Sequence, residues 1–197
     1  MSRTATIERR TGETDVRLTL GLEGTGAGTR ETGVGFLDHM LDLLARHGRL
    51  DLDVHASGDL ETGAHHTAED TAIVFGQALD RALGDRTGIV RYGAATVPMD
   101  EARASCAIDI SGRPFTLFDA ALPPGATGGF DHELTEEFFR ALANSAKLTL
   151  HVRVETGSNA HHMIEAVFKA FARALRTAVA IDPDEPGVPS TKGTLSG

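Results

Sequence analysis

Two short segments of the chain combine adjacent histidines with a glutamate one helical turn further on. Segment His65–Glu69 has the sequence His-His-Thr-Ala-Glu, and segment His161–Glu165 has the sequence His-His-Met-Ile-Glu. On a helix, residues three or four positions apart share one face, so each segment can present imidazole and carboxylate together. These groups are ligands for divalent transition metals. A single pair is more often a solvated surface feature, but finding it twice favours a metal site.

The surroundings of these segments are also repeated. Residues 36–45 and 134–143 have apolar residues at helical spacing, and each helix is followed by an alternating strand, at 50–54 and 148–152. Leu44 and Leu142 are 98 positions apart, whereas the two histidine segments are 96 apart. This difference predicts a change of loop length between strand and second helix. We therefore expect two halves, 1–88 and 89–184, that pack as one α+β body.

Smaller features complete this outline. Gly48 is expected to end the first helix, and residues 119–131 are expected to form a loop because they are rich in Pro and Gly. The segment from Asp182 onward, taken alone, is typical of a flexible C-terminus.

The repeat predicts further metal ligands. At an offset of 98, His39 in the first helix corresponds to Glu137, and both residue types can bind a metal. His132, five residues earlier, is an alternative to Glu137. Four protein ligands for each of two metals would leave positions open for substrate on an octahedral ion. Without thiolates, Mn²⁺ or Fe²⁺ is favoured over structural zinc. The predicted ligands are His39, His65, His66, Glu69, Glu137, His161, His162 and Glu165.

Composition excludes several classes of protein. The chain has 197 residues, 41% of them hydrophobic, and a formal net charge of −9, which argues against nucleic acid as the partner. No apolar run approaches the roughly 20 residues that span a bilayer, and the N-terminus has no apolar signal segment. We therefore expect a cytoplasmic protein. Cys106 is the single cysteine, which excludes an internal disulfide and a multi-cysteine zinc site.

At these residues the sequence resembles the imidazoleglycerol-phosphate dehydratase family. The resemblance runs from near residue 7 to the C-terminus, and its motifs are specific as a set. One departure is Glu137, where many members of the family carry a histidine. A carboxylate can replace imidazole on Mn²⁺, and the repeat also places a ligand there, so we keep Glu137 ahead of His132. The matching segments are Arg9–Thr14, Gly35–Met40, His65–Asp70, Met99–Ala102, His161–Ala166, Phe168–Ala170 and Pro189–Gly193.

The resemblance implies a fold and an assembly. The fold is internally duplicated α+β, of the ribosomal-protein-S5-domain-2-like kind, with helices packed on mostly antiparallel or mixed sheets. The assembly is a 24-subunit homo-oligomer with two Mn²⁺ ions per active site, at subunit interfaces. The C-terminal segment 185–197 then contributes to a phosphate site and is expected to be ordered by phosphate.

The implied function is a dehydration in histidine biosynthesis. D-erythro-imidazole glycerol phosphate would lose water to give imidazole acetol phosphate, with two divalent metals stabilising an imidazolate. By the same resemblance Glu13 is the acid/base. The residues implied for phosphate binding are Arg91, Arg113, Ser190 and Lys192.

Two other functions remain possible on the residues alone. A dinuclear metallohydrolase would use the same pair of metal sites and would release inorganic phosphate. A non-catalytic relative of S5-type RNA-binding domains would share the fold. The net charge of −9 and the repeated ligand motifs count against the second.

Overall fold

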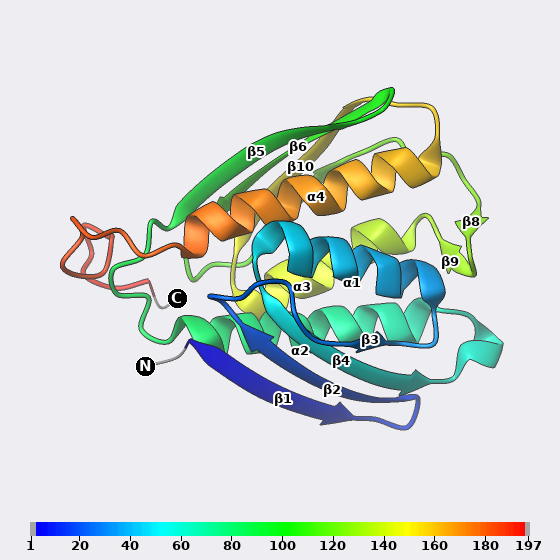
Figure 1. The fold of residues 1–197 in the computed structure, drawn as a ribbon, viewed down its shortest axis with the longest axis horizontal. Coiled ribbons are helices and arrows are strands. Elements are labelled where there is room, and N and C mark those ends of the chain that lie inside the picture. Colours follow the sequence, from blue (N-terminus) through cyan, green and yellow to red (C-terminus); the bar gives the residue numbers. More distant parts are fainter. Residues whose placement is uncertain (1–2, 196–197) are drawn as a thin grey trace.

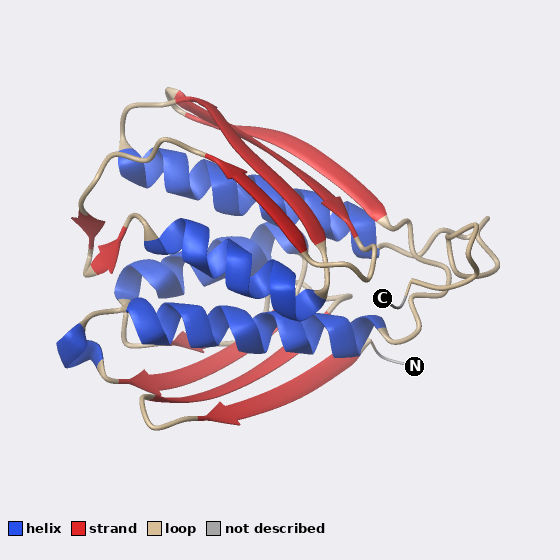
Figure 2. Cartoon of the chain, turned by 180° about the vertical axis from the view of Figure 1, so that it is seen from behind, coloured by secondary structure: helices blue, strands red, loops and turns tan. Residues whose placement is uncertain are grey.

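Two four-stranded sheets form outer layers of the molecule, and the long helices lie between them (Figures 1 and 2). The structure is a computed structural model that describes residues 3–195. Residues 1–2 of the predicted first half and residues 196–197 of the predicted C-terminal segment lie outside the described residues. This arrangement confirms the expected α+β class with helices packed on mixed sheets.

The first sheet has the strand order β1-β2-β4-β3. Its first three strands are antiparallel, whereas β3 runs parallel to β4. Alternate residues face the helices, and Val16, Leu18 and Leu20 on β2 are fully buried, as expected for a sheet with one covered face. The strands are β1 (Thr4–Arg10), β2 (Thr14–Gly21), β3 (Arg30–Glu31) and β4 (Asp51–Gly58).

The second sheet repeats this topology, with the order β5-β6-β10-β7 and a parallel pair at the same edge. The segment that we expected to be only a loop contains a small hairpin, β8 with β9, because its glycines allow a tight turn. The strands are β5 (Tyr92–Met99), β6 (Ala102–Asp109), β7 (Phe115–Asp119), β8 (Ala126–Thr127), β9 (Phe130–Asp131) and β10 (Thr149–Thr156).

The helices exchange partners between the halves. Helix α2 covers the first sheet and α4 covers the second, but α1 packs on α4 and α3 packs on α2. Each histidine segment therefore begins a helix that lies against the first helix of the other half (Figure 1). The helices are α1 (Gly35–Gly48), the short 3₁₀ turn η1 (Leu60–Thr62), α2 (His65–Leu83), α3 (Leu134–Ala146) and α4 (Ala160–Val179).

The loops between strand and second helix differ as the repeat predicted. Residues 59–64, which include η1, connect β4 to α2, whereas residues 157–159 connect β10 to α4. The longer connection brings Asp59 beside the first histidine segment.

The first helix of each half ends differently from our expectation. The left-handed residue that stops α1 is Arg49 (φ 53°), not Gly48, and Lys147 (φ 57°) stops α3 at the corresponding position. Gly48 has a packing role instead. A Cβ there would lie 3.1 Å from the Leu50 side chain and 3.6 Å from the Ala172 carbonyl oxygen.

The C-terminal segment packs against both halves, through Arg86 of the first and Arg91 of the second, rather than extending freely. Arg91 Nη1 donates to the Pro189 carbonyl at 2.8 Å, and Arg86 donates to the Leu195 carbonyl. Leu195 is only 4% exposed. The expectation of a flexible tail from composition alone was wrong, because two arginines bind its backbone carbonyls. Among residues 3–195, no helix combines the length and apolar character needed to cross a membrane.

Candidate active site

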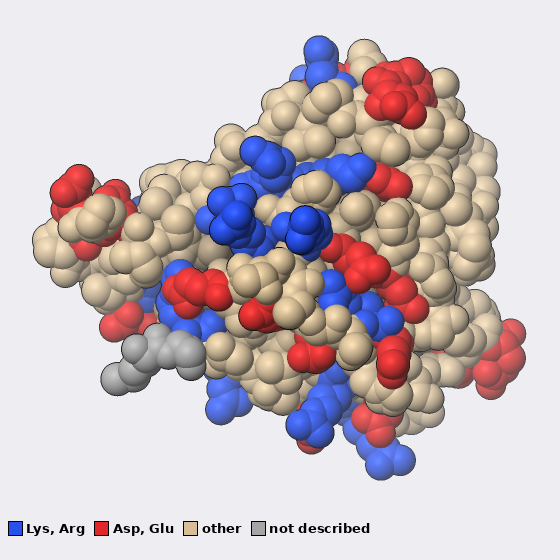
Figure 3. All heavy atoms as spheres, in the orientation of Figure 1, with Lys and Arg blue, Asp and Glu red and all other residues tan. Residues whose placement is uncertain are grey.

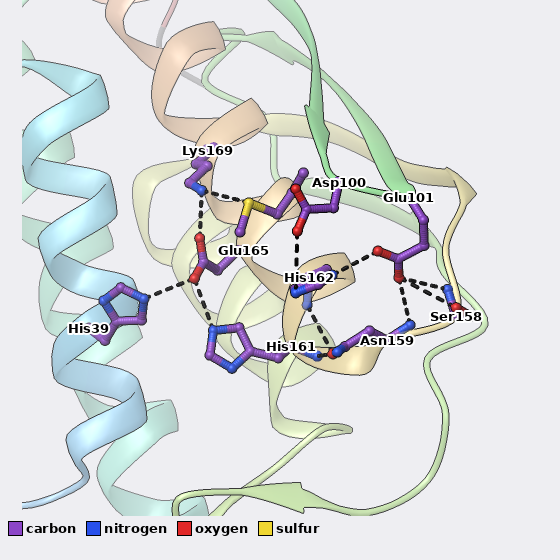
Figure 4. Close-up of polar contacts among 10 residues, drawn as sticks. His39, Asp100, Glu101, Ser158, Asn159, His161, His162, Glu165 and Lys169 are labelled. Atoms are coloured by element: carbon purple, nitrogen blue, oxygen red, sulfur yellow. Dashed lines mark hydrogen bonds and ion pairs between the residues drawn. The ribbon is translucent and has the colours of Figure 1, made fainter.

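One group of metal-capable side chains joins the two halves. His39 on α1 and His161 on α4 both approach the same oxygen, Glu165 Oε1, with Nε2–O distances of 3.0 and 2.9 Å (Figure 4). The three ligand atoms lie within 4.8 Å of one another. His39 and Glu165 are distant in sequence and meet only because α1 packs on α4. Two imidazoles and one carboxylate in this geometry suit a divalent transition metal.

Neighbouring side chains keep the carboxyl group of Glu165 ionised, as a metal ligand must be. Burial opposes its ionisation, but hydrogen bonds from Lys169, His39 and His161 outweigh burial and lower the pKa of Glu165 to about 2. Lys169 Nζ lies 2.5 Å from Oε2, which leaves Oε1 facing the two histidines. By binding Oε2, Lys169 therefore orients the carboxylate so that Oε1 is available to a metal.

The repeat places a second group at the start of α2. His65 Nε2 and Glu69 Oε2 are 3.8 Å apart. Glu137 is exposed on α3, the helix that packs on α2, so it corresponds to His39 on α1. These residues do not close into a three-ligand group within residues 3–195, where the group around Glu165 alone meets that criterion.

The second histidine of each pair is held by a carboxylate at Nδ1. His66 Nδ1 lies 3.0 Å from Asp59, and His162 Nδ1 lies 2.7 Å from Glu101. These hydrogen bonds raise the pKa of both histidines. A carboxylate at Nδ1 is the usual support of a histidine that binds a metal through Nε2.

Glu13 occupies the turn between β1 and β2. Its side chain is 58% exposed, and Oε1 lies 3.9 Å from His66 Nε2. The structure thus places the predicted acid/base next to a predicted ligand, at Nε2, the ring nitrogen that would bind a metal.

The alternative ligand His132 lies inside the loop before α3. Its Nδ1 is 2.8 Å from the Pro123 carbonyl, its Nε2 is 3.0 Å from Thr127 Oγ1, and the residue is 7% exposed. Both ring nitrogens are therefore used to hold this loop together. This geometry favours Glu137 as the eighth ligand.

The four residues implied for phosphate binding line one pocket of about 480 Å³. Arg113 and Lys192 are exposed there. Arg91 is more constrained, because its guanidinium forms a bidentate ion pair with Asp109 at 2.7 and 3.1 Å and also binds Pro189. Arg91 therefore anchors the C-terminal segment that carries Ser190 and Lys192.

Other cations gather elsewhere, over α4 and the adjoining end of α1 (Figure 3). Burial lowers the pKa of His47, and Lys169, Arg173 and Arg46 lower it further. Arg173 and Arg176 line a different pocket with residues 94–96. Positive potential is thus concentrated locally on a chain whose net charge is −9.

Glu165 is near the start of α4, whereas the C-terminal segment, which lines the pocket with Arg113, follows the other end of this helix (Figure 1). The Arg91 backbone N–H binds the Ala178 carbonyl near the end of this helix, whereas Glu165 lies near its start. At 1.5 Å per residue these positions are about 20 Å apart along the helix axis. One chain therefore does not bring its predicted metal ligands and phosphate-binding residues together.

Comparison with known proteins identifies the family. The sequence profile of imidazoleglycerol-phosphate dehydratase matches residues 32–175. The chain belongs to the imidazoleglycerol-phosphate dehydratase family. It is accordingly an enzyme, a dehydratase of histidine biosynthesis, and this membership favours dehydration over the hydrolytic alternative.

Individual relatives cover nearly the whole chain. The imidazoleglycerol-phosphate dehydratase of Symbiobacterium thermophilum is 59% identical over 98% of this chain and 93% of its own length. That of Moorella thermoacetica is 56% identical over the full length of both. The crystal structure of the Staphylococcus aureus dehydratase superposes with a TM-score of 0.82 at 42% identity, covering 90% of this chain and 99% of that one.

Sequence reasoning assigned no role to two carboxylates that hold ligand histidines. Glu101 could have been found, because it stands 88 positions after Glu13, in the corresponding turn of the repeat. Asp59 has no counterpart in the second half, where the connecting loop is shorter. Only the folded path of that loop shows its contact with His66.

The choice between Glu137 and His132 can be tested by metal analysis. We expect Glu137→Ala to lower the manganese bound per chain by about one half, because one of two sites loses a ligand. His132→Ala should retain the metal but lower the unfolding temperature, because the loop loses two buried hydrogen bonds. Elemental analysis and thermal unfolding measure the two effects. Metal loss in His132→Ala with full retention in Glu137→Ala would reverse the assignment.

Proposed function

We propose that this chain dehydrates D-erythro-imidazole glycerol phosphate to imidazole acetol phosphate and that it does so with two divalent metals, Mn²⁺ by preference. The observation that carries the proposal is the convergence of His39, His161 and Glu165 from two halves of the chain. The donor set fits such an ion, since it is rich in imidazole and carboxylate and contains no thiolate. The pseudo-equivalent residues on α2 and α3 would hold the second ion.

The chemistry requires removal of a proton from a carbon that has no adjacent carbonyl group. Bound to the substrate's imidazole, the two ions would supply the positive charge that allows the ring to accept the electron pair left by that proton. The ring would return the pair as the neighbouring hydroxyl takes up a proton from the acid/base and leaves as water, and the resulting enol would rearrange to the ketone. The work of the protein is to orient the ring and to move protons.

Glu13 is placed to move a proton. It is exposed and lies 3.9 Å from His66 Nε2, so it would face a substrate ring held at that histidine. The buried Glu165 is unsuited to this task, because Lys169, His39 and His161 already occupy its oxygens. A positioned acid/base contributes about 10²–10⁴-fold in rate.

The phosphate would be held by Arg113, Lys192 and Ser190, with Arg91 as the anchor of the segment. Arginine suits bidentate contact with phosphate oxygens. The substrate is a small molecule, on the order of 8 Å from ring to phosphate, since carbon–carbon bonds are about 1.5 Å long. It cannot connect two groups that lie about 20 Å apart on one chain.

This mismatch supports a site formed between subunits. A second copy of the chain would bring its phosphate pocket to the metal ligands of the first, as in the 24-subunit homo-oligomer that the family resemblance implies. Neither nucleic acid nor a membrane has a role in this proposal.

The role of Glu13 is tested with Glu13→Gln. We expect kcat to fall by about 10²–10⁴-fold with KM and bound manganese little changed, because only proton transfer is lost. The matched control is Glu8→Gln, an exposed glutamate on β1 whose partner is Arg17. Steady-state kinetics on both variants measures the effect, and a near wild-type kcat in Glu13→Gln rejects the assignment.

Sharing of the site between subunits is tested by co-expression of two inactive variants. His161→Ala lacks a metal ligand, and Arg113→Ala lacks a phosphate ligand. If each site combines the two parts from different chains, mixed oligomers should recover about one quarter of wild-type activity, because each part is drawn independently.

Each variant expressed alone is the control and should remain inactive. Mixed oligomers without activity would contradict a shared site. Release of inorganic phosphate instead of a keto product from the wild-type enzyme would reject the dehydration itself.

A further inference from the structure

Glu101 determines which nitrogen of His162 carries a proton. The glutamate lies at the turn between β5 and β6, and its Oε2 is 2.7 Å from His162 Nδ1 (Figure 4). An ionised carboxylate is an acceptor only, so the proton of this hydrogen bond belongs to Nδ1. In the neutral ring Nε2 then carries the lone pair, and Asp100 Oδ2 lies 3.8 Å from it.

The other oxygen of Glu101 fixes its orientation. Oε1 accepts hydrogen bonds from the backbone N–H groups of Asn159 at 2.8 Å and Ser158 at 3.2 Å. Asn159 is the N-cap of α4, and its side chain accepts from the backbone N–H groups of the two histidines that follow. Glu101 therefore connects the β5–β6 turn, the start of α4 and the His162 ring in one network.

The corresponding turn in the first half makes different contacts with its histidine. Glu13 faces His66 from the Nε2 side, and the Nδ1 contact is made by Asp59 instead. Asp59 is available because the connection between β4 and α2 is longer. The two equivalent turn glutamates thus have separate tasks, since Glu13 stays exposed beside the ring whereas both oxygens of Glu101 are committed.

We propose that Glu101 is a positioning residue that holds His162 in the Nδ1-protonated tautomer, so that Nε2 is available to a divalent cation. Asp59 does the same for His66. The cation part of this inference rests on the proposed function above. The tautomer part concerns the metal-free protein and stands on the hydrogen bonds alone.

Glu101→Gln separates the orienting role from the structural one. The amide oxygen can still accept from the N–H groups of residues 158 and 159, which places the amide NH₂ against His162 Nδ1. That nitrogen must then accept, so the ring proton moves to Nε2, where Asp100 can accept it. We expect unchanged thermal unfolding of the metal-free protein but an affinity for Mn²⁺ about 10–100-fold lower, as for other outer-shell partners.

Two further variants complete the test. Glu101→Ala removes both contacts and should lower the unfolding temperature as well as the affinity. Asp59→Asn should lower Mn²⁺ affinity in parallel with Glu101→Gln, because the opposing group at His66 Nδ1 also becomes a donor. Wild-type Mn²⁺ affinity in Glu101→Gln, in a protein that binds Mn²⁺, would overturn the proposal.

The tautomer can be observed directly by ¹⁵N solid-state NMR of histidine-labelled, metal-free protein at alkaline pH, with His162→Gln for assignment. We expect Nδ1–H in the wild type and Nε2–H in Glu101→Gln. An Nε2–H signal in the wild type would overturn the inference. The expected tautomers in a protein that does not bind Mn²⁺ would support the positioning role and refute the metal part of the proposed function.

Discussion

The exchange of helix partners between the two halves is the constraint on which the site depends. If α1 packed on α2 of its own half, His39 would lie far from Glu165, and the three-ligand group would not exist. The packing of α1 on α4 instead brings His39 Nε2 to 3.0 Å from Glu165 Oε1, although the two residues are 126 positions apart in the sequence. The same interaction buries the apolar faces of both helices, so the free energy that stabilises the core also organises the ligands.

Much of this arrangement could be predicted from the sequence, because each element of the first half has a counterpart in the second. The repeated spacing predicted the helices, the strands, the change in loop length and the correspondence between His39 and Glu137. Contacts set by the path of one loop could not be predicted, and the example is Asp59 at His66. The composition of the C-terminal segment predicted a flexible tail, but two arginines distant in sequence donate hydrogen bonds to its carbonyl groups. The left-handed residue at the end of α1 is Arg49 rather than the expected Gly48, which instead leaves room for the Leu50 side chain and the Ala172 carbonyl.

The molecule keeps its two kinds of recognition apart. Imidazoles and carboxylates gather where the histidine helices begin, whereas the pocket with Arg113 and Lys192 lies near the end of α4. Each region nevertheless holds an ion pair of its own, Lys169 with Glu165 and Arg91 with Asp109. Under the proposed function, a single chain is incomplete for a substrate that carries a ring at one end and a phosphate at the other, so the proposal requires neighbouring subunits.

The central claim is that the converging imidazoles and carboxylates bind divalent ions needed for turnover. The most direct measurement is the manganese content per chain, followed together with turnover of imidazole glycerol phosphate as metal is returned to chelated enzyme. The account predicts that activity is absent without metal and rises with occupancy until both sites are filled. Full turnover by protein shown to be free of metal would contradict it.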